Sequence, residues 1–338
     1  MHSKVTLITT FLTLLFGLAL TSQATSQPGL SLPQATTNTY TEDFTSYAHK
    51  AYTDDTVWDI WQGHARLARY DAIEQSGSAI ASDHSGNMLI VWEDSRSGNP
   101  DIYAQKMDGD GNRLWGSDVR VNSDSGTIGQ TSPDPAIASD NDGNLLIVWT
   151  DHRNGNPDIY AQKVDGSGNR LWGSDMRVNS DNGMSWQVSP AIASDSGGNV
   201  LIVWRDDRNN DGDIYTQKVD GNGNKLWDSD VRVNSDSGTS WQYSPAIASD
   251  SSGNLLIVWP DDRNGNWDIY AQKVDGYGNK LWVSDVRVNS DSSATIQSSP
   301  AIDSDSSGNL LIAWTDYRNS NGDIYAQKMD GSGNRLWV

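Results

Sequence analysis

Four strand-like segments that recur five times predict an all-β fold, a five-bladed β-propeller of four-stranded antiparallel blades. The repeat is marked by a tryptophan that ends an apolar run, with spacings of 57, 55, 55 and 55 residues, at Trp92, Trp149, Trp204, Trp259 and Trp314. A second tryptophan follows each of these, at Trp115, Trp172, Trp227, Trp282 and Trp337. No helical periodicity interrupts the pattern, and the alternative fold is an open β-solenoid.

Each repeat holds its four segments in a fixed order. In the third repeat, small residues at 190–195 predict an innermost strand, and the apolar run 199–204 predicts a strand buried on both faces. In the second repeat, the third strand is expected at 158–164, and an Asp-Gly-x-Gly-Asn turn leads into a fourth strand that extends to residues 176–179. Gly and Asn in these turns supply the positive φ angles that tight hairpins require.

The segment before the first repeat matches a fourth strand. Residues 60–67 (Ile-Trp-Gln-Gly-His-Ala-Arg-Leu) correspond position by position to residues 114–121 (Leu-Trp-Gly-Ser-Asp-Val-Arg-Val). The last repeat lacks the second half of that strand. We therefore expect residues 58–338 to form the propeller, with the N-terminal strand completing the last blade and closing the ring, which removes exposed strand edges.

The N-terminal 24 residues have the order of a secretory signal peptide. A basic start with Lys4 precedes an apolar run over 5–20 and a small-residue pattern at 22–24. A retained N-terminal anchor is the alternative, and residues 25–57 are expected to be a linker. The sequence thus predicts a secreted, extracellular or cell-surface protein with no membrane span after cleavage.

Composition narrows the function classes. The formal net charge is −20 and the chain has no cysteine. Such a polyanion repels nucleic acid and anionic lipid, because phosphate contacts need clustered Lys or Arg. Disulfides, thiolate chemistry and Cys-based zinc sites are excluded. Fifteen Trp and twelve Tyr, many of them in register, indicate a packed core.

The repeats resemble those of secreted bacterial β-propeller repeat proteins. The resemblance is carried by Asp-x-x-Gly-Asn turns before an apolar strand and an Ile-Tyr-Ala-Gln strand after it, over roughly residues 60–338. It implies the fold and leaves the function open. The turn at 165–169 is also distantly similar to the Asp-box of sialidases, but its spacing departs by one residue on each side of the glycine. Sialidase activity is therefore not implied.

Two repeated motifs have a structural and a ligand-binding interpretation. An Asp-x-Arg motif follows the first Trp of every repeat, and we expect it to be structural, although five weak ligand sites would show the same repetition. The turn with Asp108, Asp110 and Asn112 presents oxygens at alternate positions, as a Ca²⁺ loop does. Val119 stands where such a loop has its bidentate Glu, so a plain hairpin turn is favoured; no other cofactor is expected.

Three tryptophans lie outside the repeating pair, in connections expected to open on one face of a propeller: Trp186, Trp241 and Trp267. Exposed rings there could stack on sugars or contact a protein. We expect them to bind a ligand with Arg208 and Arg263 as polar partners. The alternative is that the rings pack on neighbouring loops.

Catalytic candidates are few, because only Asp303 breaks the innermost-strand pattern and only Glu93 among the three Glu lies in a blade. The favoured function is therefore a secreted, non-catalytic, multivalent recognition module with carbohydrate as the leading ligand. The alternatives are a glycan-active enzyme using inner-strand carboxylates and a scaffold for protein contacts. Symmetry separates them, since a recognition module repeats its site whereas an enzyme breaks the repeat at one place.

Overall fold

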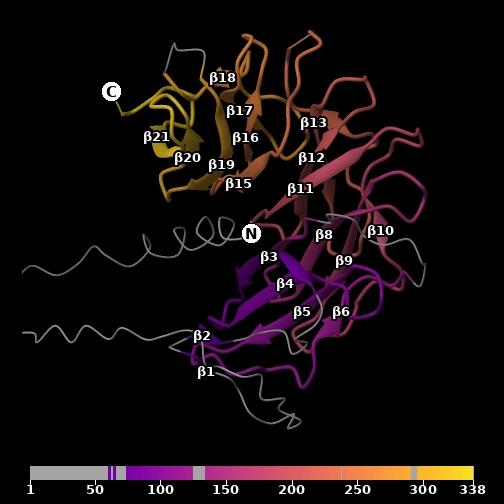
Figure 1. The fold of residues 1–338 in the computed structure, drawn as a ribbon. Helices are drawn as coiled ribbons and strands as arrows, with labels where there is room; N and C mark the ends of the chain where they lie inside the picture. The colour runs from indigo at the N-terminus through magenta and orange to yellow at the C-terminus, as the bar shows by residue number, and fades with distance from the viewer. Residues whose placement is uncertain are drawn as a thin grey trace, which may run out of the picture. The chain divides into compact units, whose positions relative to one another are not determined.

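The computed structural model describes residues 74–124, 134–236, 238–290 and 295–337, and the backbone of two short strands before them (Figure 1). The chain divides into two units, Met1–Val57 and Trp58–Val338, and every described residue belongs to the second. The predicted signal peptide and linker therefore lie outside the described residues. Within the described part, all elements are strands, and no helix is long and apolar enough to cross a membrane.

The strands form successive antiparallel sheets, which we call blades 1 to 5 in chain order (Figure 1). Blade 1 contains β3 (Gln75–Ser82), β4 (Met88–Asp94), β5 (Asp101–Met107) and β6 (Val119–Arg120). Blade 2 contains β7 (Ala136–Ser139), β8 (Leu145–Asp151), β9 (Asp158–Val164) and β10 (Met176–Arg177). Blade 3 contains β11 (Gln187–Ser194), β12 (Val200–Asp206), β13 (Asp213–Val219) and β14 (Val231–Arg232).

Blade 4 contains β15 (Ala246–Ser249), β16 (Leu255–Asp261), β17 (Asp268–Val274) and β18 (Val286–Arg287). Blade 5 contains β19 (Gln297–Ser304), β20 (Leu310–Asp316) and β21 (Asp323–Met329), which are its described strands. Strand order and pairing confirm the predicted all-β, five-bladed propeller.

The segment predicted to close the ring is described only in part. β1 (Ile60–Trp61) pairs with β2 (His64–Ala65) in a short antiparallel ladder of its own. The expected pairing with blade 5 is not among the described ladders, and residues 62–63 and 66–73 lie outside the described residues. Completion of the last blade by the N-terminal strand stays a prediction.

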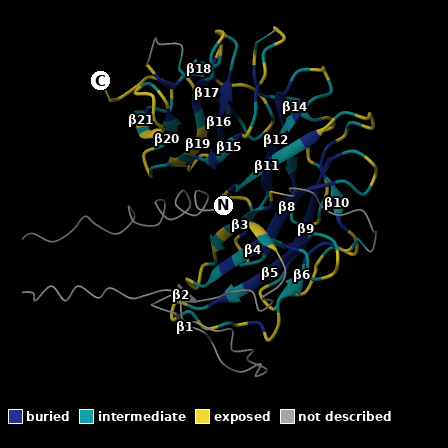
Figure 2. Ribbon diagram, in the orientation of Figure 1, coloured by how far each residue is buried: buried dark blue, intermediate teal, exposed yellow. Residues whose placement is uncertain are grey.

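The core lies between blades. Leu146 and Ile159 of blade 2 pack in one cluster with Ile202, Trp204 and Tyr215 of blade 3, and equivalent clusters join other neighbouring blades. Figure 2 shows the burial concentrated in the second and third strands of the blades. Full burial of one such aliphatic side chain is worth about 1.5–3 kcal/mol, so each blade is stabilised mainly by its neighbours.

Hydrogen bonds also link the innermost strands. In four described cases a serine hydroxyl donates to the backbone carbonyl of the equivalent serine one blade earlier, at 2.7–2.9 Å: Ser139 to Ser82, Ser194 to Ser139, Ser249 to Ser194 and Ser304 to Ser249. These bonds align neighbouring innermost strands along their length. Equivalent positions of the repeat therefore lie at the same end of every blade.

The Asp-x-Arg motif is structural, as expected. In blade 3, the fully buried Asp206 accepts a hydrogen bond from Trp204 Nε1 at 2.9 Å and pairs with Arg208, whose guanidinium also reaches Asp230 at 2.8 Å and lies 4.1 Å from the Tyr215 ring centre. The fork thus joins strands of one blade. The link to the previous blade runs instead through Asp230, which accepts from the Ser180 backbone N at 2.8 Å.

Candidate functional site

The repeat varies most at one end of the blades, where first strands begin and second strands end. The register brings these termini together, since Ser76 pairs with Glu93 and Val188 with Arg205. The residue before the invariant Asp of the second strand differs between blades: Glu93, Thr150, Arg205, Pro260 and Thr315. The residue after that Asp also differs: Ser95, His152, Asp207, Asp262 and Tyr317. We call this end, including residues 74, 134, 186 and 241 beside it, the variable face.

A backbone irregularity shapes the variable face in every blade. Equivalent residues at the start of the first strand have positive φ angles of 40–57°: Gly77, Asp134, Ser189, Ser244 and Ser299. The strand register shifts at this point in β3, β11 and β19. Such bulges re-aim side chains and are common beside active sites. Asp134 is the residue of this set that carries a charge.

Carboxylates of Asp134 and Glu74 affect the protonation of Glu93 at the variable face. Burial raises the pKa of Glu93, and the charges of Asp134 and Glu74 raise it further, while a 3.0 Å hydrogen bond from Ser76 Oγ opposes the shift. Asp134 keeps access to solvent, yet the protein atoms packed around it disfavour its charged form and raise its pKa. The two carboxyl groups therefore both have raised pKa values, but for different reasons: burial and neighbouring charges act on Glu93, and burial alone acts on Asp134.

Asp303, the other predicted catalytic candidate, lies elsewhere. It pairs with Leu311 near the far end of β19 and is exposed, and its Oδ1 accepts a hydrogen bond from the Ser304 backbone N at 2.8 Å. The counterpart of Glu93 in this blade is Thr315, four residues further along β20, a separation of about 13 Å at the usual strand rise. The structure thus does not bring Asp303 and Glu93 together.

Sequence reasoning missed Asp134 and Glu74. A signal was present, because Asp134 occupies a position that is Gly or Ser in the other repeats and Glu74 one that is Trp or Ile in three of them. Glu74 precedes β3 in the same blade as Glu93, whereas the effect of Asp134 on Glu93 depends on contact between blades, which one repeat cannot show.

The three extra tryptophans have different surroundings. Trp186 is 58% and Trp241 43% exposed, whereas Trp267 is half-buried and packs edge-on against Tyr243, with ring centres 4.6 Å apart. The guanidinium of Arg205 lies 4.8 Å from the Trp241 ring centre. The first two rings are therefore available at the surface, and the third is partly used in packing.

The predicted polar partners of these rings are engaged within their blades. Arg208 makes the contacts described above, and Arg263 pairs likewise with Asp261 and Asp285 and lies 4.2 Å from the Tyr270 ring centre. The arginine that contacts an exposed tryptophan is instead Arg205.

The turn with the predicted calcium ligands is closed by its own hydrogen bonds. Asp108 Oδ1 accepts from the backbone N of Asp110 at 3.0 Å and of Asn112 at 2.7 Å, and Oδ2 accepts from Asn112 Nδ2 at 2.9 Å. These bonds hold the pKa of Asp108 below its usual range. In the described part of the chain, no group of three or more His, Cys, Asp or Glu side chains is placed to hold a metal ion. Calcium binding by this turn stays a prediction.

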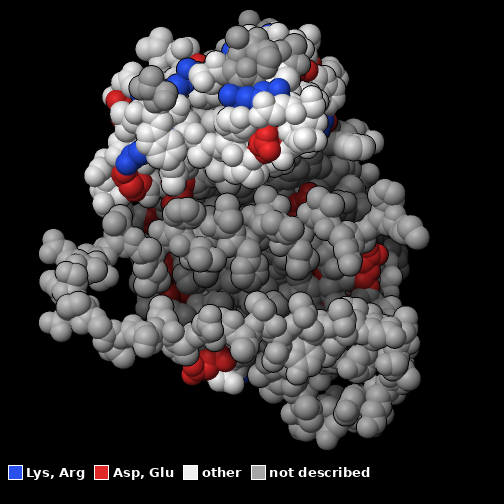
Figure 3. All heavy atoms as spheres, turned by 60° about the vertical axis from the view of Figure 1, so that its left-hand side comes forward, with Lys and Arg blue, Asp and Glu red and all other residues white. Residues whose placement is uncertain are grey.

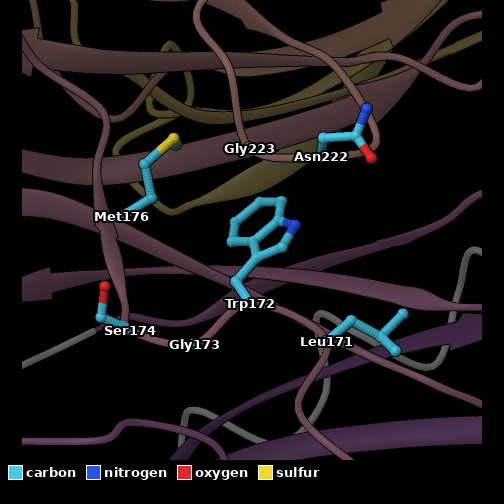
Figure 4. A pocket seen from close by; sticks show the side chains of 7 residues that line it. All are labelled: Leu171, Trp172, Gly173, Ser174, Met176, Asn222 and Gly223. Carbon is cyan, nitrogen blue, oxygen red and sulfur yellow. The ribbon is translucent and has the colours of Figure 1, made fainter.

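A hollow of about 570 Å³ lies between the outer part of blade 2 and a turn of blade 3. In Figure 4 the Trp172 indole points toward the turn that holds Asn222 and Gly223. Gly223 has φ +86°, and a Cβ there would lie 3.2 Å from Trp172 Cε2, so glycine permits the close approach. Because Gly168 and Gly278 meet Trp115 and Trp227 in the same way, this is a repeated packing contact.

On the face shown in Figure 3, acidic side chains are visible at several separate places and basic side chains in short groups. The variable face is distinguished by its residues rather than by a charged patch in this view.

Neither a family model nor a curated protein matches the sequence. Solved structures do match. An α-L-arabinanase from Penicillium chrysogenum, complexed with arabinobiose, is 14% identical, with 75% of this chain and 80% of that chain covered and a TM-score of 0.54. The α-L-arabinofuranosidase of Fusarium graminearum is 12% identical, with 75% and 80% covered and a TM-score of 0.52. A polysaccharide lyase, an ulvan lyase, is 12% identical, with 77% and 70% covered and a TM-score of 0.52.

At these identities the likeness shows the propeller fold. It also corrects the functional expectation, because the three proteins are enzymes that act on polysaccharides or their fragments. The preference for a non-catalytic recognition module was wrong on this comparison.

Proposed function

We propose that this protein is a glycan-active enzyme, a glycoside hydrolase with Glu93 and Asp134 as its carboxyl pair. The observation that carries the proposal is the position of Glu93 and Asp134 on the variable face, where the charge of Asp134 adds to the burial that raises the pKa of Glu93. Glycosidic bond cleavage needs two carboxyl groups in different environments, one protonated and one ionised. The other repeats have Thr, Arg or Pro in place of Glu93 and Gly or Ser in place of Asp134, so the pair breaks the fivefold repeat as an enzyme's site is expected to do.

Glu93 is the general acid in this proposal. Burial and the nearby charges of Asp134 and Glu74 favour its protonated form, and the hydrogen bond from Ser76 Oγ to Oε2 fixes the carboxyl group. It would donate its proton to the leaving glycosidic oxygen. Asp134, which keeps access to solvent, is the carboxylate that attacks the sugar or activates water.

The proposed substrate is an extracellular polysaccharide. The predicted N-terminal signal sequence supports action outside the cell, as do the repeats that resemble those of secreted bacterial propeller proteins. The matching arabinanase, arabinofuranosidase and ulvan lyase support a glycan as substrate.

The test is hydrolysis of a panel of neutral and acidic polysaccharides by the mature protein and by the variants Glu93→Gln and Asp134→Asn. Loss of a general acid or base lowers the rate about 10²–10⁴-fold, and we expect each variant to show such a loss with an unchanged melting temperature. Asp303→Asn, at the other end of its blade, is the matched control and should keep full activity. Undiminished activity in Glu93→Gln would refute the assignment, and unsaturated products would indicate a lyase instead.

A further inference from the structure

Asp207 connects the two exposed tryptophans of the variable face. Its backbone N donates to the carbonyl oxygen of Trp186 at 2.9 Å. Its carboxylate accepts from Arg205 Nε and Nη2, each at 2.9 Å, and this fork holds the guanidinium over the Trp241 ring. The Trp186 backbone and the Trp241 ring therefore each contact a member of one ion pair. We call the four residues Trp186, Arg205, Asp207 and Trp241 the tryptophan pair site.

The backbone holds this site in place. Asp262 Oδ1 accepts from the Trp241 backbone N at 2.7 Å, and the next residue, the buried Gln242, donates its backbone N to the Gly212 carbonyl at 2.6 Å. A Cβ on Gly212 would lie 2.6 Å from Arg205 Nε and 2.7 Å from the Gln242 carbonyl oxygen, so only glycine admits the arginine here. A surface fixed in this way loses little conformational entropy when a ligand binds.

The tryptophan pair site breaks the repeat a second time. The counterparts of Arg205 are Glu, Thr, Pro and Thr, and no other described blade places an arginine over a tryptophan ring. Its rings are 58% and 43% exposed, whereas the tryptophans that end the second strands are at most 4% exposed. Packing in the repeat therefore does not account for these two rings.

We infer that the tryptophan pair site binds the sugar rings of an uncharged polysaccharide, through stacking on Trp186 and Trp241 and hydrogen bonds from hydroxyl groups to the Arg205–Asp207 pair. The inference rests on the proposed function, for which it supplies the substrate class. Indole faces attract the apolar C–H faces of sugars, and an arginine–carboxylate pair offers both donors and acceptors to hydroxyl groups.

The charges around the tryptophan pair site favour an uncharged polysaccharide over an anionic one. Asp207 neutralises Arg205, and Asp262 lies directly beside Trp241. The carboxylates of Glu74 and Asp134 add negative charge to the same face, as their effect on the Glu93 carboxyl shows. A chain bearing uronate or sulfate groups would be repelled over this surface, whereas a neutral chain pays no such electrostatic penalty.

Binding is measured in Glu93→Gln, which holds substrate without cleaving it, by affinity electrophoresis through a neutral arabinan or xylan and through a uronate polymer. We expect retardation by a neutral polymer, with each Trp→Ala change at 186 or 241 weakening it about 2- to 13-fold, the equivalent of the usual worth of one stacked ring. Trp241→Phe should retain most of the affinity. Tyr277→Ala removes an 86% exposed ring from a turn at the other end of blade 4 and should change nothing.

Kinetics separate this inference from the proposed function. In the otherwise unmodified enzyme, Trp186→Ala and Trp241→Ala should raise KM by the same factors and leave kcat unchanged, whereas Glu93→Gln should lower kcat. Loss of activity in Glu93→Gln with unchanged KM in the double tryptophan variant would overturn the tryptophan pair site alone. Stronger retardation by the uronate polymer would overturn the uncharged substrate class. Retardation that depends on the two rings, without hydrolysis of any polymer, would uphold the site and refute the enzyme.

Discussion

Replacing Asp206 with alanine should destabilise the protein severely. The Asp206 side chain is fully buried and accepts hydrogen bonds from Trp204 Nε1 and from the Arg208 backbone N, each at 2.9 Å, besides pairing with the Arg208 guanidinium. Removing one partner of a buried ion pair costs about 3–5 kcal/mol. Because Arg208 keeps Asp230 at 2.8 Å, we expect the lower end of that range. This is a large part of the roughly 5–15 kcal/mol by which domains are stable.

The measurement is denaturant-induced unfolding followed by tryptophan fluorescence. Asp207→Ala is the matched control, because Asp207 is the next residue and pairs with Arg205 through side chains that are each 21% exposed. Partly exposed pairs contribute about 0–1 kcal/mol, so this variant should unfold near the parent. If both substitutions lowered the free energy of unfolding by the same small amount, the structural role of the Asp-x-Arg motif would be refuted. The motif would then again be a candidate ligand site.

Three further predictions concern closure, ions and pH. Deletion of residues 58–70 should abolish cooperative unfolding, since the last blade would lose its outer strand; an unchanged melting transition would argue against closure by this segment. If the turn with Asp108 binds calcium, chelation should lower the melting temperature, and no shift at millimolar calcium would leave it a hairpin turn. Because the pKa of Glu93 is raised, its protonated form persists to higher pH than in an ordinary Glu, and activity should fall as pH rises through that raised pKa. The pH–rate profile checks this, and an alkaline limb that survives in Glu93→Gln would contradict it.

Much of the fold follows from local sequence. The apolar run predicted at 199–204 is β12 (Val200–Asp206), and the third strand predicted at 158–164 is β9 with the same bounds. Turn residues and alternating side chains act within a few positions, so the sequence of one repeat suffices to place its strands. The fourth strands are shorter than predicted, for example Met176–Arg177 within 176–179, because only these residues pair with β9.

The site depends on contacts that local sequence does not encode. Sequence reasoning chose Arg208 as a partner for the exposed rings, yet Arg205 contacts Trp241. Side chains alternate along a strand, so Trp204 and Asp206 share one face of β12 and hold Arg208 there, while Arg205 points to the other face. Which face meets the next blade, and which connection lies over it, is decided by packing between blades.

In each blade, the residues that repeat and the residue proposed to act on the substrate are different ones. The buried Trp and Asp at the end of the second strand repeat in all five blades, and in each the Trp Nε1 donates to the Asp carboxylate at 2.9–3.1 Å. This contact fixes the backbone on both sides of the residue between them, which is partly exposed in blades 1, 3 and 5 and buried in blades 2 and 4. That residue is Glu93 in blade 1 and Arg205 in blade 3, the first in the carboxyl pair and the second in the tryptophan pair site. A uniform scaffold can thus acquire an asymmetric site through substitutions at one position, since each new side chain is presented by the same rigid frame.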